Sequence, residues 1–201
     1  QLIAIATDTK GLFIYKKRKF NSIVNTSPAP GTTNGYYSQL VLDSTRLLTD
    51  WRLEFDQYGA YPTKLPIVRN IAENIFRDNH NNIWYSHGDT LLKYSTLNNT
   101  IEPIAYFKSN RAVCFFQSGD SLIIGTLKNV YSYKNNFLNH IGNISSRKAN
   151  ANPFTVFTYQ DNKIWFGTIK GLFIFNPQTH VIDTIRELYQ SMVHNTKLFK
   201  D

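Results

Sequence analysis

Residues 164–175 decide the fold: Ile164-Trp165-Phe166-Gly167-Thr168, a polar break, and then Leu172-Phe173-Ile174-Phe175. A similar stretch lies 81 residues earlier, with Ile83-Trp84-Tyr85-Ser86 followed by Leu91-Leu92-Lys93-Tyr94. In both stretches, two short apolar runs with a period of two are separated by a turn-forming break. Because this period is the signature of β-strands, each stretch is predicted to form two antiparallel strands joined by a short turn.

The same pattern returns along the whole chain. One turn residue precedes the second apolar run of each copy, and these markers lie 38 to 42 residues apart, at Gly11, Arg52, Thr90, Asn129 and Gly171. Around the best copy, four strand-like segments alternate with turns rich in Gly, Pro, Asn and Asp, which favour tight bends. Four strands in about 40 residues is the size of a β-propeller blade. We therefore predict one all-β propeller domain of about five four-stranded blades, with repeats at 1–24, 25–65, 66–105, 106–145 and 146–201.

The two ends of the chain allow two interpretations of whether the propeller closes into a ring. Phe199-Lys200-Asp201 is similar to Phe76-Arg77-Asp78, where a first strand ends, and Gln1-Leu2-Ile3 is similar to Asn162-Lys163-Ile164, where a second strand begins. In one interpretation, the C-terminal strand completes the first blade and closes a five-bladed ring, which would remove exposed sheet edges. In the other, the chain is an arc of a larger propeller.

Two segments have helical as well as strand character. Ile185, Leu188, Tyr189 and Met192 fall at helical spacing, so residues 183–193 are either a short helix or a continuation of the last blade. Residues 68–75 show the same ambiguity. There we predict a strand, because the corresponding residues of the other copies are β-branched and aromatic.

Composition and charge narrow the class of protein. The chain has 201 residues, of which 42% are hydrophobic and 14% aromatic, so it is expected to bury a core and not to be disordered. It has no apolar run of about 18 residues, and its first residues lack a basic, signal-like start, which indicates a processed or excised N-terminus. The single cysteine, Cys114, is predicted to be a buried apolar residue. The net charge of +8 favours anionic partners without choosing among them.

The best copy resembles a known repeat. Ile164-Trp165-Phe166-Gly167-Thr168, Lys170-Gly171-Leu172 and Phe175-Asn176-Pro177 are similar to the two-component regulator propeller repeat, and residues 82–94 are a second good copy. This repeat occurs in the periplasmic sensor regions of hybrid two-component histidine kinases of Bacteroidetes. The resemblance implies a periplasmic sensor domain that recognises a carbohydrate-type signal and relays it to a kinase. It also favours an excised arc, since the full sensor regions have more blades.

The sequence nominates no catalytic, metal or cofactor site. Acidic residues recur in the first inter-strand turn of the copies, where they are predicted to bond their own backbone: Asp43, Asp78, Asp120, Asp161 and Asp201. No carboxylate pair stands out for glycoside hydrolysis. The five histidines occupy different repeat positions, which argues against a metal site. Trp84 and Trp165 are predicted to pack between blades.

A ligand-binding rim is predicted from the turns that precede the markers. These turns contain Lys10, Trp51, Asp89, Lys128 and Lys170. Stacked blades would bring their lysines to one face, where they could attract an anionic sugar or peptide, and Trp51 is a candidate platform for stacking against a sugar. The basic run at residues 16–19 falls in the next turn, hence on the opposite face, and is interpreted as a solvated hairpin tip that does not bind nucleic acid.

Taken together, these features predict a sensor or ligand-binding propeller without enzymatic activity. Its expected partners are a small-molecule or oligosaccharide ligand and the neighbouring blades or domains of the parent chain, and a homodimer is left open. Two alternatives remain. One is a propeller enzyme acting on polysaccharide, such as a lyase, and the other is a protein-interaction scaffold.

Overall fold

A computed structural model describes the backbone of residues 2–7, 11–16, 19–23, 38–49, 52–66, 71–143, 153–159, 163–168, 171–176, 179 and 181–184. Side chains are described for residues 38–49, 52–66, 74–143, 163–168, 171–176, 179, 181 and 183. Within these ranges the regular structure is β-strand, and the strands form five antiparallel sheets. No described helix is long and apolar enough to span a membrane.

Each sheet is one consecutive stretch of chain, and we number the sheets as blades 1 to 5. Blade 1 contains β1 (Leu2–Thr7), β2 (Gly11–Lys16) and β3 (Lys19–Ile23). Blade 2 contains β4 (Gln39–Val41), β5 (Leu47–Thr49), β6 (Leu53–Phe55) and β7 (Ala60–Pro62). Blade 3 contains β8 (Ile71–Arg77), β9 (Ile83–His87), β10 (Thr90–Ser95) and β11 (Thr100–Tyr106). Blade 4 contains β12 (Ala112–Ser118), β13 (Ser121–Thr126), β14 (Asn129–Lys134) and β15 (Phe137–Asn143), and blade 5 contains β16 (Pro153–Tyr159), β17 (Lys163–Thr168), β18 (Gly171–Asn176) and β19 (Val181–Thr184).

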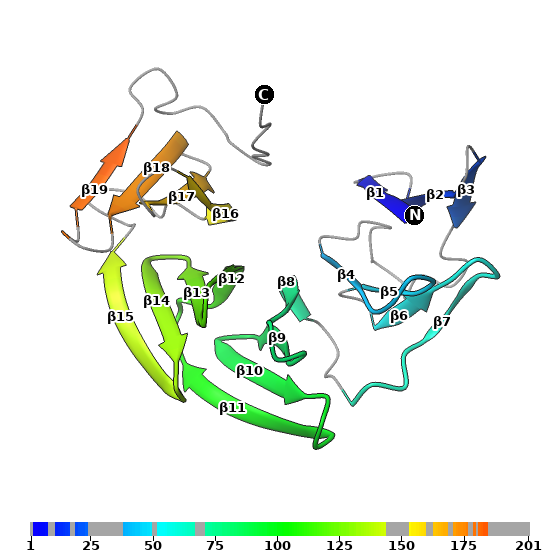
Figure 1. Cartoon of the computed structure of the whole chain (residues 1–201), viewed down its shortest axis with the longest axis horizontal. Helices are drawn as coiled ribbons and strands as arrows, with labels where there is room; N and C mark the ends of the chain where they lie inside the picture. The colour runs from blue at the N-terminus through cyan, green and yellow to red at the C-terminus, as the bar shows by residue number, and fades with distance from the viewer. Residues whose placement is uncertain are drawn as a thin grey trace.

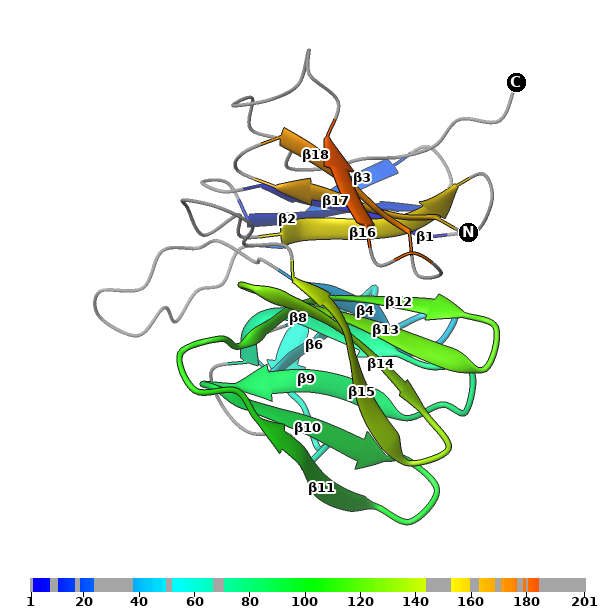
Figure 2. The same cartoon turned by 90° about the vertical axis from the view of Figure 1, so that its left-hand side faces the viewer.

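The blades follow one another along an arc (Figure 1). Strands pair in chain order within each blade, as Figure 2 shows for β12 to β15 of blade 4. The first strands of blades 2 to 5 contact one another in succession: β4 with β8, β8 with β12, and β12 with β16. Sheets that pack radially through their first strands form a β-propeller, so the predicted fold class is confirmed. In Figure 1, blades 1 and 5 are not adjacent, and the described strands form an open arc.

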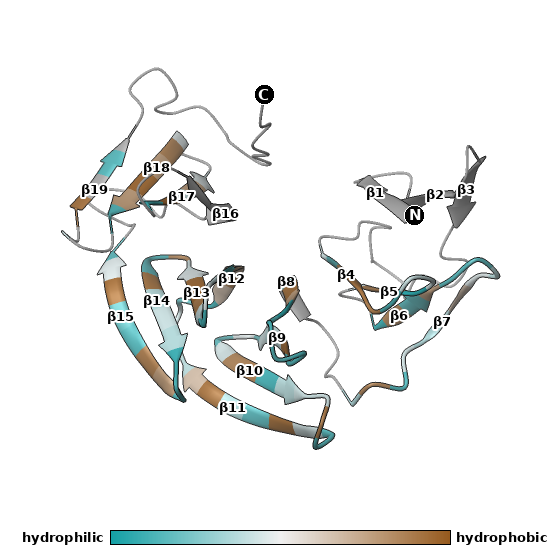
Figure 3. Ribbon diagram, in the orientation of Figure 1, coloured by the Kyte–Doolittle hydropathy of each residue, from teal (hydrophilic) through white to brown (hydrophobic). Residues whose placement is uncertain are grey.

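The core lies between blades. Trp84 is 1% exposed and packs in one cluster with Phe115, Leu122 and Ile124 of blade 4, while its indole meets the ring of Tyr133 edge-on at 4.7 Å. Two further clusters join blades 2 and 3 and blades 4 and 5 in the same way. The predicted inter-blade role of Trp84 is therefore confirmed, whereas Trp165 is only half-buried. In Figure 3 the outer strands β11 and β15 alternate between hydrophilic and hydrophobic residues, but β18 is mostly hydrophobic.

A glycine allows blades 4 and 5 to approach closely. A Cβ atom added to Gly125 would clash with the Cys114 Sγ of the neighbouring strand and would lie 3.2 Å from the Phe166 Cε1 of the next blade. Cys114 is itself 1% exposed and is buried in the cluster that joins these blades, as its sequence neighbours predict. Burial raises the pKa of the Cys114 thiol to about 12, so the thiol stays protonated and acts as packing volume.

Replacing Gly125 tests this close approach. We expect Gly125→Ala to lower the free energy of unfolding by about 1–3 kcal/mol, because the added methyl overpacks the interface between blades 4 and 5. The cost should be smaller in a Cys114→Ala background, since that change removes the nearer clashing atom. Urea denaturation of the wild type, the two single variants and the double variant measures the coupling. Strictly additive costs would contradict the steric conflict between a side chain at position 125 and Cys114 on the neighbouring strand.

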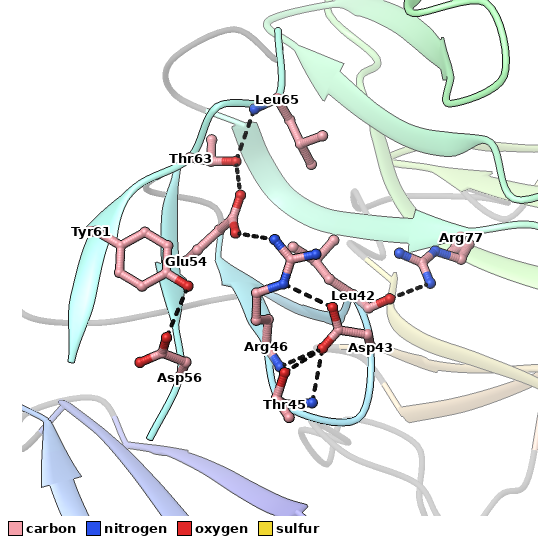
Figure 4. Close-up of polar contacts among 10 residues, drawn as sticks. All are labelled: Leu42, Asp43, Thr45, Arg46, Glu54, Asp56, Tyr61, Thr63, Leu65 and Arg77. Carbon is pink, nitrogen blue, oxygen red and sulfur yellow. Dashed lines mark hydrogen bonds and ion pairs between the residues drawn. The ribbon is translucent and has the colours of Figure 1, made fainter. Parts of the chain in front are cut away.

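Blade 2, the degenerate copy, replaces part of its core with polar contacts (Figure 4). Glu54 is 4% exposed, yet its repeat position is occupied by Leu92 in blade 3 and Phe173 in blade 5. Its carboxylate accepts hydrogen bonds from Arg46 Nη1 at 3.1 Å and from the Thr63 hydroxyl. These partners satisfy a buried charge that would otherwise destabilise the blade.

Asp43 forms the predicted Asx turn between β4 and β5. Its Oδ1 accepts hydrogen bonds from the backbone N–H groups of Thr45 and Arg46 at 2.9 and 3.0 Å, and its Oδ2 accepts one from Arg46 Nε at 2.8 Å. The backbone hydrogen bond from Thr45, followed by the hydrogen bond from Arg46, holds the pKa of Asp43 far below its ordinary value. Asp43 thus links the turn to the Arg46–Glu54 pair.

The lowered pKa of Asp43 predicts a pH dependence of stability. Its unfolded pKa is about 3.9. The ionised carboxylate therefore stabilises the fold above that pH, and this contribution is lost as the pH falls below it. We expect Asp43→Asn to be less stable than the wild type at neutral pH, with the difference shrinking between about pH 5 and about pH 2. Urea unfolding across this range measures it, with Asp120→Asn at an exposed turn as the control. A difference between Asp43→Asn and wild type that is the same at both extremes would contradict the prediction.

The remaining predictions about secondary structure have mixed outcomes. β8 confirms a strand at residues 71–75, because Ile71 and Ile75 pair with His87 and Tyr85 of β9, whereas residues 68–70 lie outside the described residues. β19 extends to Thr184, so Asp183 and Thr184 belong to a strand and not to a helix, since both pair with β18. Residues 185–193 and the proposed closing strand at 199–201 lie outside the described residues. At the basic run, Lys16 of β2 pairs with Lys19 of β3, as expected for a hairpin.

Candidate functional site

Two of the predicted rim residues lie at the same end of the blades. Asp89 precedes β10 and Lys128 precedes β14, and residues 107–111, which connect blades 3 and 4, run between them. Asp89 Oδ2 accepts a hydrogen bond from Ser109 N at 2.7 Å, and Asn110 Oδ1 accepts one from Lys128 N at 2.8 Å. The Asp89 carboxylate therefore holds this connection in place. Lys10, Trp51 and Lys170 lie outside the described residues.

Two basic residues of this rim were missed by the sequence reasoning. Lys108 is exposed, and Arg111 accepts a hydrogen bond from Leu127 N through its backbone carbonyl at 3.2 Å. Both lie in the connection between copies, which the search for repeated turn positions did not cover.

A cavity of about 390 Å³ lies at the opposite end of blades 3 and 4. It is formed by the β8–β9 turn, the β12–β13 turn and the end of β14 with its following turn, together with residues of β10 and β13. Its lining residues are Asp78, His80, Asn82, Lys93, Gln117, Asp120, Leu122, Tyr133, Lys134, Asn135 and Asn136. The volume is in the range of small-molecule sites. None of these residues was predicted to bind a ligand.

Asp78 builds one wall of the cavity. Its Oδ1 accepts from the backbone N–H groups of His80 and Asn82 at 2.9 and 2.8 Å. Its Oδ2 accepts from Asn82 Nδ2 at 2.9 Å and from the buried Trp84 Nε1 at 2.7 Å. With four donors, the carboxylate holds both the predicted Asx turn and the tryptophan of the inter-blade core, so it is a structural group of the wall.

Lys93 lies against the aromatic residues beneath the cavity. Its Nζ is 2.7 Å from Glu102 Oε2 and 3.3 Å from the Tyr133 hydroxyl, and it lies 5.9 Å from the Trp84 ring centroid. Burial, the largest single effect, disfavours the ammonium. The hydrogen bonds to Glu102 and Tyr133 outweigh it, so the pKa of Lys93 is raised above its ordinary value. Lys93 is a charged group with a carboxylate partner and not a nucleophilic amine.

Two consecutive asparagines form the far lip of the cavity. Lys134 pairs with Phe137 across the β14–β15 hairpin, and the two residues between them, Asn135 and Asn136, have φ angles of 52° and 63°. Two central residues with positive φ are typical of a type I′ turn, for which asparagine and glycine are favoured. Asn136 Oδ1 accepts a hydrogen bond from the Tyr133 hydroxyl at 3.0 Å. In blade 3, Tyr94 and Asn99 repeat this contact at 3.0 Å, away from the cavity.

The groups left for a ligand are mainly neutral and polar. Among the described residues, the side chains of His80 and Asn135 have no hydrogen-bond partner, while Asn82 Oδ1 and Asn136 Nδ2 are the unused ends of their amides. Leu122 and Tyr133 add apolar surface. This set can donate to and accept from hydroxyl groups while covering a carbon face. No described group of three His, Cys, Asp or Glu residues is placed to hold a metal ion.

The role of Asp78 can be tested against a matched turn residue. We expect Asp78→Ala to lower the free energy of unfolding by about 2–3 kcal/mol, because it leaves the buried Trp84 N–H and turn amides without an acceptor. Asp120→Ala in the corresponding turn of blade 4 should change it by at most about 0.5 kcal/mol, since the Asp120 side chain is 85% exposed and its ion-pair partner Lys134 is 4.0 Å away. Thermal and urea unfolding measure both. Equal costs for the two variants would rule out this role of Asp78.

Comparison with known proteins shows shared architecture at low sequence identity. The sequence matches no family profile and no curated protein. A streptogramin B lyase structure is 14% identical with a TM-score of 0.64, over 96% of this chain and 68% of the lyase. A structure described as the extracellular domain of a hybrid two-component system of B. thetaiotaomicron is 14% identical with a TM-score of 0.57, over 92% of this chain and 33% of that domain. The virginiamycin B lyase of Staphylococcus aureus is 10% identical with a TM-score of 0.55, over 75% of this chain and 55% of the lyase.

These matches establish the propeller fold. At such identities they show the fold alone. The chain spans about a third of the extracellular domain and about half of the Staphylococcus aureus lyase that it matches. The structural neighbours therefore include both extracellular sensor domains and propeller lyases.

Proposed function

We propose that this chain is a ligand-binding propeller of an extracytoplasmic sensor in a hybrid two-component system, and that it recognises a carbohydrate-type signal without turning it over. The cavity between blades 3 and 4 carries the proposal, because its unused hydrogen-bonding groups are amides and an imidazole, which suit sugar hydroxyls, and Leu122 and Tyr133 add apolar surface that suits ring faces. The fold shared with extracellular domains of two-component systems supports the cellular context.

The structural groups near the cavity also favour binding over turnover. Asp78 is occupied by four donors, and Lys93 is held as an ammonium by Glu102, so neither is poised as a base. The rim of Asp89 and Lys128 remains a second proposed contact surface, for a neighbouring domain or an anionic signal. The lyase neighbours make a propeller enzyme the alternative.

A binding and turnover screen separates the two functions. We expect the chain to gain thermal stability with at least one class of oligosaccharide, since a ligand that binds only the folded state raises the unfolding temperature. The recovered saccharide should be chemically unchanged after prolonged incubation, as measured by mass spectrometry. Virginiamycin B and acidic polysaccharides serve as substrates for the alternative. Cleaved products from any of them would establish a lyase and overturn the proposal, as would the absence of stabilisation by every saccharide.

A further inference from the structure

We propose that the cavity between blades 3 and 4 binds an uncharged, hydroxyl-rich segment of the ligand, such as a neutral sugar ring, and excludes sugar acids. This inference rests on the proposed function and specifies the ligand class of that same site. It revises the expectation of an anionic ligand, which came from the net charge of the whole chain and from the lysines of the opposite rim.

The cavity is lined by as many carboxylates as ammonium groups, namely Asp78, Asp120, Lys93 and Lys134. Lys93 Nζ lies 2.7 Å from Glu102 Oε2, and Lys134 Nζ lies 4.0 Å from Asp120 Oδ2. Asp78 is satisfied by four hydrogen-bond donors. An incoming carboxylate would therefore meet two lining aspartates, a lysine already paired with Glu102, and the exposed Lys134 beside Asp120. Since this lining holds no excess of cations to offset the desolvation of an anion, the cavity disfavours an anionic ligand despite the net charge of +8.

The unused hydrogen-bonding groups are arranged on two sides. His80 and Asn82 come from the β8–β9 turn, while Asn135 and Asn136 come from the β14–β15 turn. The first turn is tied to blade 4 by a hydrogen bond from Asn79 Nδ2 to Gly119 O at 3.2 Å. Amide groups both donate and accept, so they match hydroxyl groups, which do the same. Between these two sides, Leu122 and Tyr133 offer a surface for the C–H face of a sugar ring.

The hairpin of blade 4 allows the amides to be removed without disturbing the fold. Asn135→Gly and Asn136→Gly keep residues that tolerate the positive φ of the type I′ turn. The matched control is Asn99→Gly in blade 3, where φ is 55° and the side chain accepts a hydrogen bond from Tyr94 just as Asn136 accepts one from Tyr133. Asn99 does not line the cavity.

The experiment titrates the whole chain by calorimetry with short neutral gluco-, manno- and xylo-oligosaccharides and with oligogalacturonates. We expect a neutral saccharide to bind, and the Asn135→Gly/Asn136→Gly variant to lose affinity by about tenfold or more. Asn99→Gly should bind like the wild type. His80→Ala, an exposed residue of the other wall, should weaken binding independently of the hairpin. Affinity should not depend on salt.

The outcomes distinguish this inference from the proposed function. If neutral saccharides bind but neither the hairpin variant nor His80→Ala weakens binding, the cavity is not the site, although carbohydrate recognition stands. If only oligogalacturonates bind, with affinity that falls with salt and with Lys134→Ala, the assignment of a neutral ligand is wrong. If no saccharide binds at all, the proposed function fails together with the inference.

Discussion

Apolar packing between neighbouring blades holds this structure together. A four-stranded sheet of about 40 residues has two faces and cannot cover either alone, so each blade places large side chains against the next. Trp84 shows how specific this packing is: its ring meets Tyr133 of blade 4, and its indole N–H is satisfied by Asp78. A single hydrogen bond therefore joins Trp84, which packs between blades, to Asp78 in the β8–β9 turn.

The cavity lies beside this pair of residues, and Asp78 forms part of its wall. Asp78, Trp84, Lys93 and Tyr133 are joined by hydrogen bonds and ring contacts, and this connected set supports the floor and one wall. The two turns that flank it belong to different blades, and their distance is set by the packing beneath them. A rigid base with polar turns at its edges is an arrangement suited to positioning a small polar ligand.

Sequence reasoning located the propeller and the turns but not the cavity. The repeat spacing, the strands on either side of Trp84 and the Asx turns at Asp43 and Asp78 follow from local patterns of polarity and turn chemistry. The rim was predicted by placing equivalent turns on one face, and Asp89 and Lys128 do share an end of the blades. In the segment 183–193, left open between helix and strand, Asp183 and Thr184 pair with β18 and belong to β19, while the residues at helical spacing lie outside the described part of the chain.

A chain of similar β-sheet units can be predicted from the sequence, because period-two hydrophobicity and turn residues act over a few neighbouring positions. Which polar residues face one another becomes visible only when the blades are packed. Asn82 and Asn135 are 53 positions apart and belong to different copies. The Lys93 ammonium donates a hydrogen bond to the Tyr133 hydroxyl of the next blade, 40 positions away. Contacts of this kind depend on how two separately encoded sheets pack, and no local pattern along one strand specifies them.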